Sequence, residues 1–281
     1  MRIAQTKTDL REALEELNRP IGLVPTMGNL HQGHLDLMQW STRKTASTIA
    51  TIFVNPLQFS PTEDFSSYPR MLAEDAKKLE SNGVDLLFAP SDEEMYPHGK
   101  ETHTNVTVPE ITATLCGQSR PTHFAGVTTV VTKLFHLCQP DMAFFGEKDW
   151  QQLAVIKRMT QELDFPLEIE GVPTTRHSDG LAMSSRNQYL SEEERQIAPK
   201  LFETLRHLAN KCFTLNVDFR ELETAGAKQL EDLGFRPDYV AIRDENTLQP
   251  TTKFTHDLRV FGAAYLGKAR LIDNVSVNLG D

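Results

Sequence analysis

The chain has 281 residues, of which 39% are hydrophobic and 24% charged, and a formal net charge of −10. This length suffices for one large or two moderate hydrophobic cores, and the acidic charge argues against a general nucleic-acid binder because no overall basic field would gather phosphates. The three cysteines lack C-x-x-C spacing and so support neither a disulfide framework nor a cysteine zinc site. No stretch approaches the roughly 20 apolar residues of a membrane span. A cytoplasmic protein is therefore expected.

Short apolar runs alternate with helix-length amphipathic runs through about the first 170 residues. The polar residues 1–20 predict a helix capped by Thr8 or Asp9, without the apolar core of a signal peptide. Strands are expected at residues 21–24, 47–55, 84–90, 141–146 and 167–173. Helices are expected from residue 35 onward and at residues 68–83, 126–140 and 149–163. The β-branched start of 126–140 is also typical of a strand, although the length of this segment and Pro140 at its end favour a helix. This alternation predicts an α/β fold, a doubly wound parallel sheet with helices on both faces.

The pattern changes beyond Thr175. A helix is expected after Ser191 and Glu194, which have capping-box spacing, and a second helix at 219–233. A strand at 238–244 and a hairpin at 261–277 with Gly267 at its turn follow. Two helices and then strands predict a smaller α+β domain. Residues 91–122 form the longest stretch without a clear element, which is typical of a functional or capping loop.

His31 and His34 stand in VPTMGNLHQGHLDL, residues 24–37, where a short apolar strand turns into a helix. Residues three apart share a helical face, so both imidazoles can meet one ligand, and Gly33 lets the backbone approach it closely. Open α/β sheets bind ligands at the carboxyl ends of their strands, where helix N-termini favour anions. A zinc site is less favoured, because such a helix would place histidines at i and i+4 with a glutamate between them. This stretch alone also fits a glycine-rich turn with two incidental histidines.

Asn55 and Gln58 end the next strand, in FVNPLQF at residues 53–59. Their amides, flanked by apolar side chains, are suited to hydrogen-bond the hydroxyls or carboxylate of a small, partly apolar substrate. An Asn-Pro turn with aromatic packing explains the same residues at least as well.

Gly146 and Lys148 repeat this arrangement in FFGEKDWQQ, residues 144–152, after the strand at 141–146. Lys148 offers a compact positive charge for a phosphate, and Gln152 lies on the same helical turn. Asp149 either caps the helix or contacts a nucleotide.

A last cluster lies in DGLAMSSRNQYL, residues 179–190. Ser184, Ser185 and Arg186 combine two hydroxyls with a guanidinium, which is suited to grip phosphates. The S-S-R stretch by itself is more typical of a solvated loop. Its occurrence together with three strand-end clusters favours the ligand-binding interpretation.

Taken in order, PTMGNLHQGH, FVNPLQF, RPTHFAGVTTVV, GEKDWQQ and DGLAMSSRN make the chain resemble the pantothenate synthetases. This family condenses pantoate with β-alanine at the expense of ATP and is related to nucleotidyl-transferring α/β enzymes such as class I aminoacyl-tRNA synthetases. The resemblance spans essentially the whole chain. It implies a Rossmann-like nucleotide- and pantoate-binding domain at 1–175, a smaller domain at 176–281 with the counterpart of the mobile K-M-S-K-S loop, and a homodimer.

The resemblance also implies the site residues. His34 would donate a proton in adenylation, with His31, Lys148 and Arg186 as further catalytic residues. Gln58 and Gln152, with Asn55, would bind pantoate, and Gln58 would also border β-alanine. ATP, accompanied by Mg²⁺, would contact Met27, Gly28, Asn29, Leu30, His31, Gln32, Gly33, His34, Gly146, Glu147, Lys148, Asp149, Thr175, Met183, Ser184, Ser185 and Arg186. Departures from the family pattern are modest, at Leu57, Trp150 and Thr175.

The implied reaction has two steps. The pantoate carboxylate attacks the α-phosphorus of ATP, which forms pantoyl adenylate and pyrophosphate, and the β-alanine amine then releases AMP. Two alternatives stay open on the residues alone: another small-molecule nucleotidyltransferase of the same architecture, and a non-catalytic nucleotide-sensing module. No nucleic-acid or membrane partner is expected.

Overall fold

The computed structural model describes residues 1–60, 65–213, 217–251 and 255–277. The chain divides into two compact units. Unit 1 comprises Met1–Pro109, Arg120–Glu147 and Val155–Pro173, and unit 2 comprises Glu110–Ser119, Lys148–Ala154 and Thr174–Asp281. The predicted domain boundary after residue 175 stays a prediction. Two earlier segments of the chain are grouped with the C-terminal part, and both prove important for the site.

Unit 1 is built on a six-stranded sheet in the order β1-β4-β3-β2-β5-β6, and all its strand pairs are parallel. β2 and β3 are buried along almost their whole length, as expected for parallel strands covered on both faces. The α/β prediction is therefore confirmed. The strands are β1 (Arg2–Ala4), β2 (Ile21–Thr26), β3 (Ser47–Ile52), β4 (Leu86–Phe88), β5 (Met142–Gly146) and β6 (Glu168–Val172).

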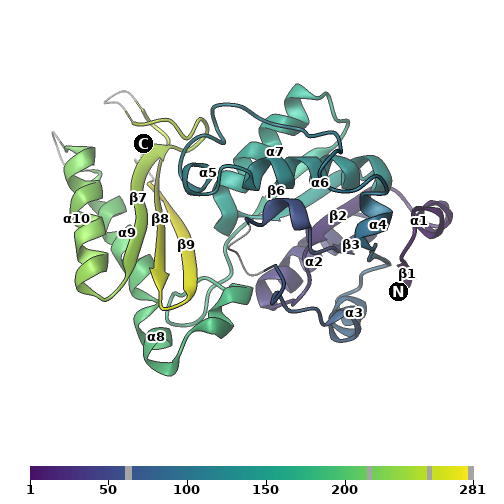
Figure 1. Ribbon diagram of the computed structural model, residues 1–281, viewed down its shortest axis with the longest axis horizontal. Helices are drawn as coiled ribbons and strands as arrows, with labels where there is room; N and C mark the ends of the chain where they lie inside the picture. The colour runs from purple at the N-terminus through teal and green to yellow at the C-terminus, as the bar shows by residue number, and fades with distance from the viewer. Residues whose placement is uncertain (61–64, 214–216, 252–254, 278–281) are drawn as a thin grey trace. The chain divides into compact units, whose positions relative to one another are not determined.

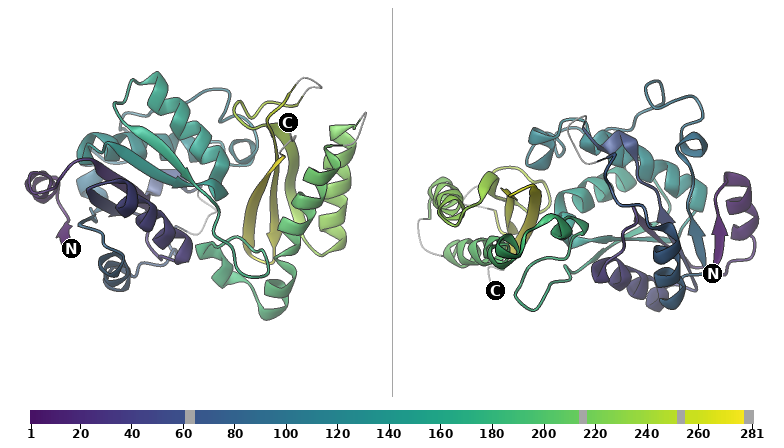
Figure 2. Two further views of the ribbon diagram at one scale, coloured as in Figure 1. Left: turned by 180° about the vertical axis from the view of Figure 1, so that it is seen from behind. Right: turned by 60° about the horizontal axis from the view of Figure 1, so that its bottom comes forward.

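Helices cover both faces of this sheet (Figures 1 and 2). α2 (Gln32–Lys44) and α3 (Leu72–Ser81) pack together on one face. On the other face α6 (His123–Cys138) lies against both α1 (Lys7–Leu14) and α7 (Trp150–Glu162), with Thr132 Oγ1 3.3 Å from Met159 Sδ. α7 belongs to unit 2 up to Ala154 and to unit 1 from Val155.

The N-terminus differs from its prediction. Residues 2–4 form strand β1 beside β4, and α1 begins at Lys7 rather than after Thr8 or Asp9. Thr6 is the capping residue because its hydroxyl accepts from the Asp9 N–H while the Asp9 carboxylate accepts from the Thr6 N–H, each at 3.1 Å. Residues 91–122, expected to be a loop, contain the short helices α4 (Asp92–Met95) and α5 (Cys116–Ser119).

Unit 2 is built on the antiparallel sheet β7-β8-β9, formed by β7 (Arg236–Asp244), β8 (Leu258–Leu266) and β9 (Ala269–Val277). α9 (Lys200–Lys211) and α10 (Phe219–Asp232) cover one face of it (Figure 1). α8 (Glu192–Ile197) starts with the predicted capping box of Ser191 and Glu194. The smaller α+β unit and its hairpin turn at Gly267, where φ is +53°, are confirmed.

No helix among residues 1–60, 65–213, 217–251 and 255–277 combines the length and the apolar character that a membrane crossing requires.

Candidate active site

The connectivity of the unit 1 sheet reverses between β2 and β5. β2 leads to its neighbour β3 on one side, and β5 leads to its neighbour β6 on the other. Open α/β sheets bind ligands outside the carboxyl ends of the strands at such a switch point. The turn at 27–31 leaves β2, Gly146 ends β5, and Asn55 to Gln58 follow β3. Three segments singled out in the sequence therefore lie at one edge of the sheet.

The turn that follows β2 is held by helix α3. The buried Asp75 carboxylate accepts hydrogen bonds from the backbone N–H groups of Asn29 at 2.7 Å and Leu30 at 2.9 Å. Lys78 Nζ donates to the Leu30 carbonyl at 2.8 Å. Gly28 has φ +80°, a conformation that favours glycine. The sequence offered no sign of the roles of Asp75 and Lys78, because no local pattern connects residues so far apart.

His31 and His34 lie side by side at the start of α2. Their ring centroids are 4.0 Å apart, which confirms the shared face that their spacing predicts. The His31 backbone N–H donates to His34 Nδ1 at 3.4 Å, and the His34 N–H donates to the His31 carbonyl at 2.9 Å. Because Nδ1 of His34 accepts, the neutral ring carries its proton on Nε2.

Asn55 is 1% exposed and is tied to protein groups. The Tyr96 hydroxyl donates to Asn55 Oδ1 at 2.8 Å, and Asn55 Nδ2 donates to the Gly126 carbonyl at 3.0 Å. Burial raises the pKa of Tyr96, so its phenol keeps the donated proton. Asn55 Oδ1 also accepts from the Leu57 N–H at 3.3 Å, which starts the 3₁₀ turn η1 (Pro56–Gln58). These contacts give Asn55 a structural role, and its contact with pantoate stays a prediction.

Gln58 ends this turn, and its backbone is held by residues at the start of α6 and just before it. Its carbonyl accepts from His123 Nδ1 at 2.9 Å and from Arg120 Nη2 at 3.3 Å, and its Nε2 lies 2.8 Å from Met27 Sδ. A Cβ on Gly126 would lie 2.6 Å from the Gln58 backbone nitrogen, so only glycine permits this close packing. Arg120, His123 and Gly126 belong to the RPTHFAGVTTVV motif, which supports the family resemblance but predicts no role for them.

In unit 2, Lys148 opens the segment that leads into α7. Its side chain is 19% exposed, and its Nζ lies 3.5 Å from Asp149 Oδ2. Trp150 Nε1 donates to the Glu245 carbonyl at 2.8 Å. Asp149 directly precedes α7, so both of its predicted roles, capping and nucleotide contact, stay open.

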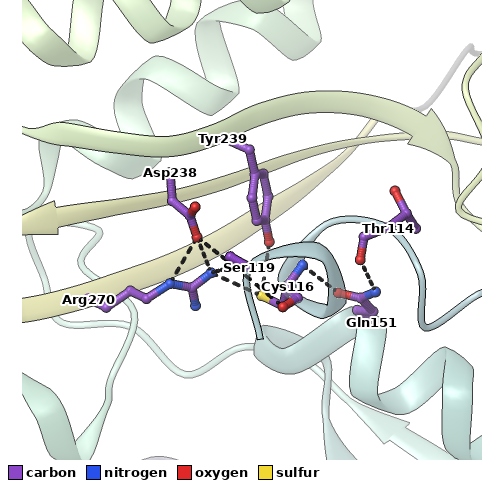
Figure 3. Close-up of polar contacts among 7 residues, drawn as sticks. All are labelled: Thr114, Cys116, Ser119, Gln151, Asp238, Tyr239 and Arg270. Atoms are coloured by element: carbon purple, nitrogen blue, oxygen red, sulfur yellow. Dashed lines mark hydrogen bonds and ion pairs between the residues drawn. The ribbon is translucent and has the colours of Figure 1, made fainter. Parts of the chain in front are cut away.

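Gln151 connects the same segment to residues 111–116, and Figure 3 shows its contacts with Thr114 and Cys116. Its Oε1 accepts from the Cys116 N–H at 3.0 Å, and its Nε2 donates to the carbonyls of Ile111 at 3.0 Å and Thr114 at 2.7 Å. Cys116 Sγ lies 3.1 Å from the Tyr239 hydroxyl, whose pKa is raised chiefly by burial. Gln151 is therefore part of the scaffold, and the neighbouring Gln152 is the candidate for substrate binding.

Residues 175–183 of unit 2 form a short hairpin. The Met183 N–H donates to the Thr175 carbonyl at 2.9 Å, and Arg176 and Ala182 form a β-bridge. The turn thus brings two predicted ATP contacts, Thr175 and Met183, next to each other. The hairpin leads into η3 (Ser185–Tyr189), where Ser184 Oγ accepts from the Arg186 N–H at 3.2 Å.

Lys148 and Ser184 line one small pocket of unit 2, together with Ala182, Asn187 and Asp273. Its volume of ≈ 10 Å³ is about the room that one water molecule needs. Two predicted phosphate-binding segments, far apart in the sequence, are therefore neighbours within this unit.

The predicted site residues are divided between the two units. Unit 1 contains residues 27–34, Asn55, Gln58, Gly146 and Glu147, and unit 2 contains Lys148, Asp149, Gln152, Thr175 and residues 183–186. Within the described part of the chain, no group of three or more His, Cys, Asp or Glu side chains is arranged to hold a metal ion.

Comparison with known proteins identifies the family. The family model described as pantoate-beta-alanine ligase matches residues 2–276. A pantothenate synthetase of Pseudomonas savastanoi is 50% identical over 278 residues, 98% of each chain. A crystal structure of pantothenate synthetase from Thermus thermophilus superposes with a TM-score of 0.91 at 46% identity, covering 99% of this chain and 100% of that one.

A second solved structure is a pantoate-beta-alanine ligase from Francisella tularensis, complexed with beta-gamma ATP and β-alanine. It is 34% identical, with a TM-score of 0.83 over 100% of this chain and 99% of that one. The resemblance read from the five sequence motifs is confirmed. The chain belongs to the pantoate–β-alanine ligase family.

Proposed function

We propose that the protein condenses (R)-pantoate with β-alanine through a pantoyl-adenylate intermediate, consuming ATP and releasing AMP and pyrophosphate. The observation that carries this proposal is the placement of the family motifs. The segments after β3, β2 and β5 meet at the switch point of the sheet in a chain that the ligase family model matches over residues 2–276.

Activation is needed because a carboxylate is a poor acyl donor. In the first step a pantoate carboxylate oxygen bonds to the α-phosphorus of ATP, and the bond to pyrophosphate breaks. In the second step the β-alanine amine attacks the acyl carbon, loses a proton, and displaces AMP. Both steps need charge neutralisation and positioning more than covalent help from the protein.

His34 is assigned the proton donor. Its Nδ1 accepts from the His31 N–H, so we assign Nε2–H as the donor to substrate. Histidine titrates near neutral pH, and phosphate oxygens favour its cationic form, so it can donate as charge develops on pyrophosphate. His31, Lys148 and Arg186 are assigned to neutralise and hold phosphate oxygens, and the other predicted ATP contacts keep their assignments.

Pantoate is assigned to Gln58 and Gln152, with Gln58 also bordering β-alanine. The backbone of Gln58 is fixed by His123 and Arg120, so its amide is preorganised for a small polar substrate. Asn55 supports this amide, since its Nδ2 lies 3.3 Å from Gln58 Oε1.

Mg²⁺ is proposed to enter with ATP as part of the substrate. Mg²⁺ prefers oxygen ligands and is commonly held by substrate phosphates, water and one or two carboxylates. The Asp149 carboxylate beside Lys148 fits this donor set, because its side chain is 45% exposed. When bound, the ion neutralises phosphate charge.

A cytoplasmic homodimer is also proposed, through unit 1. β6 forms one edge of its sheet, and edge strands present backbone groups that another chain can pair with. Leu163, between α7 and β6, is 50% exposed, which supports an apolar contact there.

Pantoate-dependent exchange of labelled pyrophosphate into ATP, without β-alanine, tests the function. We expect exchange with pantoate and none without it, and formation of pantothenate when β-alanine is added.

His34→Ala is expected to lower the rate of this exchange by a factor of about 10²–10³, the usual cost of losing one preorganised donor. His207→Ala, at an exposed position on α9, is the matched control. Near-native exchange by His34→Ala would contradict the assignment, and exchange that ignores pantoate would favour another nucleotidyltransferase.

A further inference from the structure

Two consecutive residues of β9, Asp273 and Asn274, hold two separate segments of the proposed ATP site. Both are 5% exposed. Asn274 Nδ2 donates to the Lys148 carbonyl at 3.0 Å. Asn274 therefore fixes the backbone from which the Lys148 side chain departs.

Asp273 holds the other segment, the hairpin that leads to residues 183–186. Its two carboxylate oxygens accept from Arg176 Nη1 at 2.5 Å and Nη2 at 2.8 Å. Arg176 Nη1 also donates to the Gly180 carbonyl at 3.1 Å, across the hairpin turn, and the guanidinium lies 3.8 Å from the ring centroid of Phe202. Such a two-point contact fixes the orientation of the arginine as well as its position.

The two anchors are connected to each other. The Asn274 N–H donates to Asp273 Oδ1 at 2.8 Å, so the carboxylate that orients Arg176 also contacts the residue that orients Lys148. Asn274 Oδ1 accepts from Arg259 Nη1 at 2.5 Å. Arg259 in turn bonds Glu245 Oε2 at 3.0 Å and stacks 3.4 Å from the centroid of Trp150. One network therefore holds both the backbone of Lys148 and the indole ring of Trp150.

We propose that Asp273 and Asn274 are positioning residues that set the spacing between Lys148 and the segment at 183–186 for the triphosphate of ATP. Neither is assigned a contact with substrate. Their effect is on ATP binding and adenylation, and the attack of β-alanine on a preformed adenylate does not depend on it. This inference rests on the proposed function.

Asn274→Asp and Asp273→Asn test the two anchors one at a time, with little change in side-chain size. Asn274→Asp replaces the donor to the Lys148 carbonyl with an acceptor and keeps an oxygen for Arg259. Asp273→Asn removes one of the two charge-assisted contacts to Arg176. Glu223→Gln is the control, because Glu223 Oε1 accepts from Arg243 Nη1 at 2.5 Å and ties α10 to β7 of the same sheet.

The expected result is a KM for ATP raised about tenfold in each β9 variant, the change that follows from losing one charge-assisted or buried hydrogen bond. The KM for pantoate and the conversion of added pantoyl adenylate with β-alanine stay within about twofold, as do all parameters of Glu223→Gln. Loss of both half-reactions in proportion, or a KM for ATP no higher than that of the control, would overturn the proposal.

ATP affinity measured by calorimetry gives a readout that requires no turnover. Weakening by about tenfold in both variants supports the positioning role even if pantoate-dependent exchange fails in the wild type, whereas unchanged affinity overturns it. Should Asn274→Asp fail to fold, Asn274→Ser removes the reach to the Lys148 carbonyl without adding a charge, and the same change in affinity is expected.

Discussion

At the scale of single residues, two positions of the candidate site require glycine for different reasons: Gly28 for the fold and Gly146 for the approach of a ligand. Gly28 has φ +80°, and a Cβ there would lie 3.1 Å from Asp75 Oδ2, so the fold itself requires it. Gly146 ends β5 at the switch point, and apart from its two chain neighbours no described residue would have an atom within 4 Å of a Cβ there. This open space at the end of the strand allows a ligand to approach the backbone closely.

Gly146→Ala is therefore expected to leave folding intact and to weaken ATP binding. Stability should be unchanged or raised by about 0.4–1 kcal/mol, because alanine restricts the unfolded chain, while the KM for ATP should rise at least about tenfold through the steric clash. Thermal unfolding and steady-state kinetics measure the two effects.

Gly234→Ala is the matched control for that change. Its Cβ would also meet nothing within 4 Å, but φ is +92°, so it should cost about 1–2 kcal/mol of stability and leave the KM for ATP unchanged. A Gly146→Ala enzyme with normal ATP kinetics would show that this glycine serves no ligand.

At the scale of elements, the sequence predicted the strand-to-helix turns well, because hydrophobic periodicity and capping residues act over a few residues. The capping box at Ser191 and Glu194 and the shared face of His31 and His34 are both confirmed. The same local patterns missed the contacts that hold these turns, such as the carboxylate of Asp75 on the backbone of Asn29. Such contacts join residues brought together only by the fold.

The packing of α6 against η1 gives an element-scale prediction. A Cβ on Gly126 would lie 2.5 Å from the Leu57 carbonyl carbon and 2.6 Å from the Gln58 nitrogen. Gly126→Ala should therefore push η1 away from α6, cost about 1–3 kcal/mol of stability by overpacking, and raise the KM for pantoate. Urea unfolding and initial rates at varied pantoate concentration measure both effects.

Gly226→Ala in α10 is the comparison for overpacking alone. Its Cβ would lie 2.5 Å from Leu208 Cδ1, so it should cost stability while the KM for pantoate stays unchanged. Equal KM values for pantoate in the two variants would refute the link between α6 and substrate binding.

At the scale of the whole molecule, the fold class and family were predictable from the sequence, whereas the assignment of chain segments to the two units was not. Residues 148–154 follow a strand of unit 1 yet belong to unit 2, because Gln151 bonds residues 111–116 and Asn274 bonds Lys148. No periodicity in the sequence reports such long-range pairs. The motif that carries Lys148 was visible, but its anchor in β9 was not.

Alkaline stability of the chain should depend on Cys138. This thiol at the end of α6 is buried, which raises its pKa from 9.0 to about 12. The folded state holds the proton more tightly than the unfolded state, so the stabilising contribution is complete below pH 9 and is lost as pH rises from about 9 toward 12. The loss is at most about 1.4 kcal/mol per pH unit.

Cys138→Ala should consequently be less stable than the wild type at pH 8, through the lost packing, and the difference should shrink between pH 9 and 11. Urea unfolding at each pH measures the free energies. Burial also raises the pKa of Cys212, to about 11. Because both proteins contain Cys212, its contribution cancels in the difference between their free energies of unfolding. A difference that stays constant with pH would contradict the buried-thiol explanation.

Attack of the pantoate carboxylate on the α-phosphorus of ATP leaves an isotope trace, because the carboxylate oxygen that bonds to phosphorus stays with AMP. Pantoate labelled with ¹⁸O in its carboxylate is turned over with ATP and β-alanine, and the products are analysed by mass spectrometry. We expect one ¹⁸O in the phosphate of each AMP released and none in pyrophosphate. AMP without ¹⁸O, or label recovered in inorganic phosphate beside ADP, would contradict it.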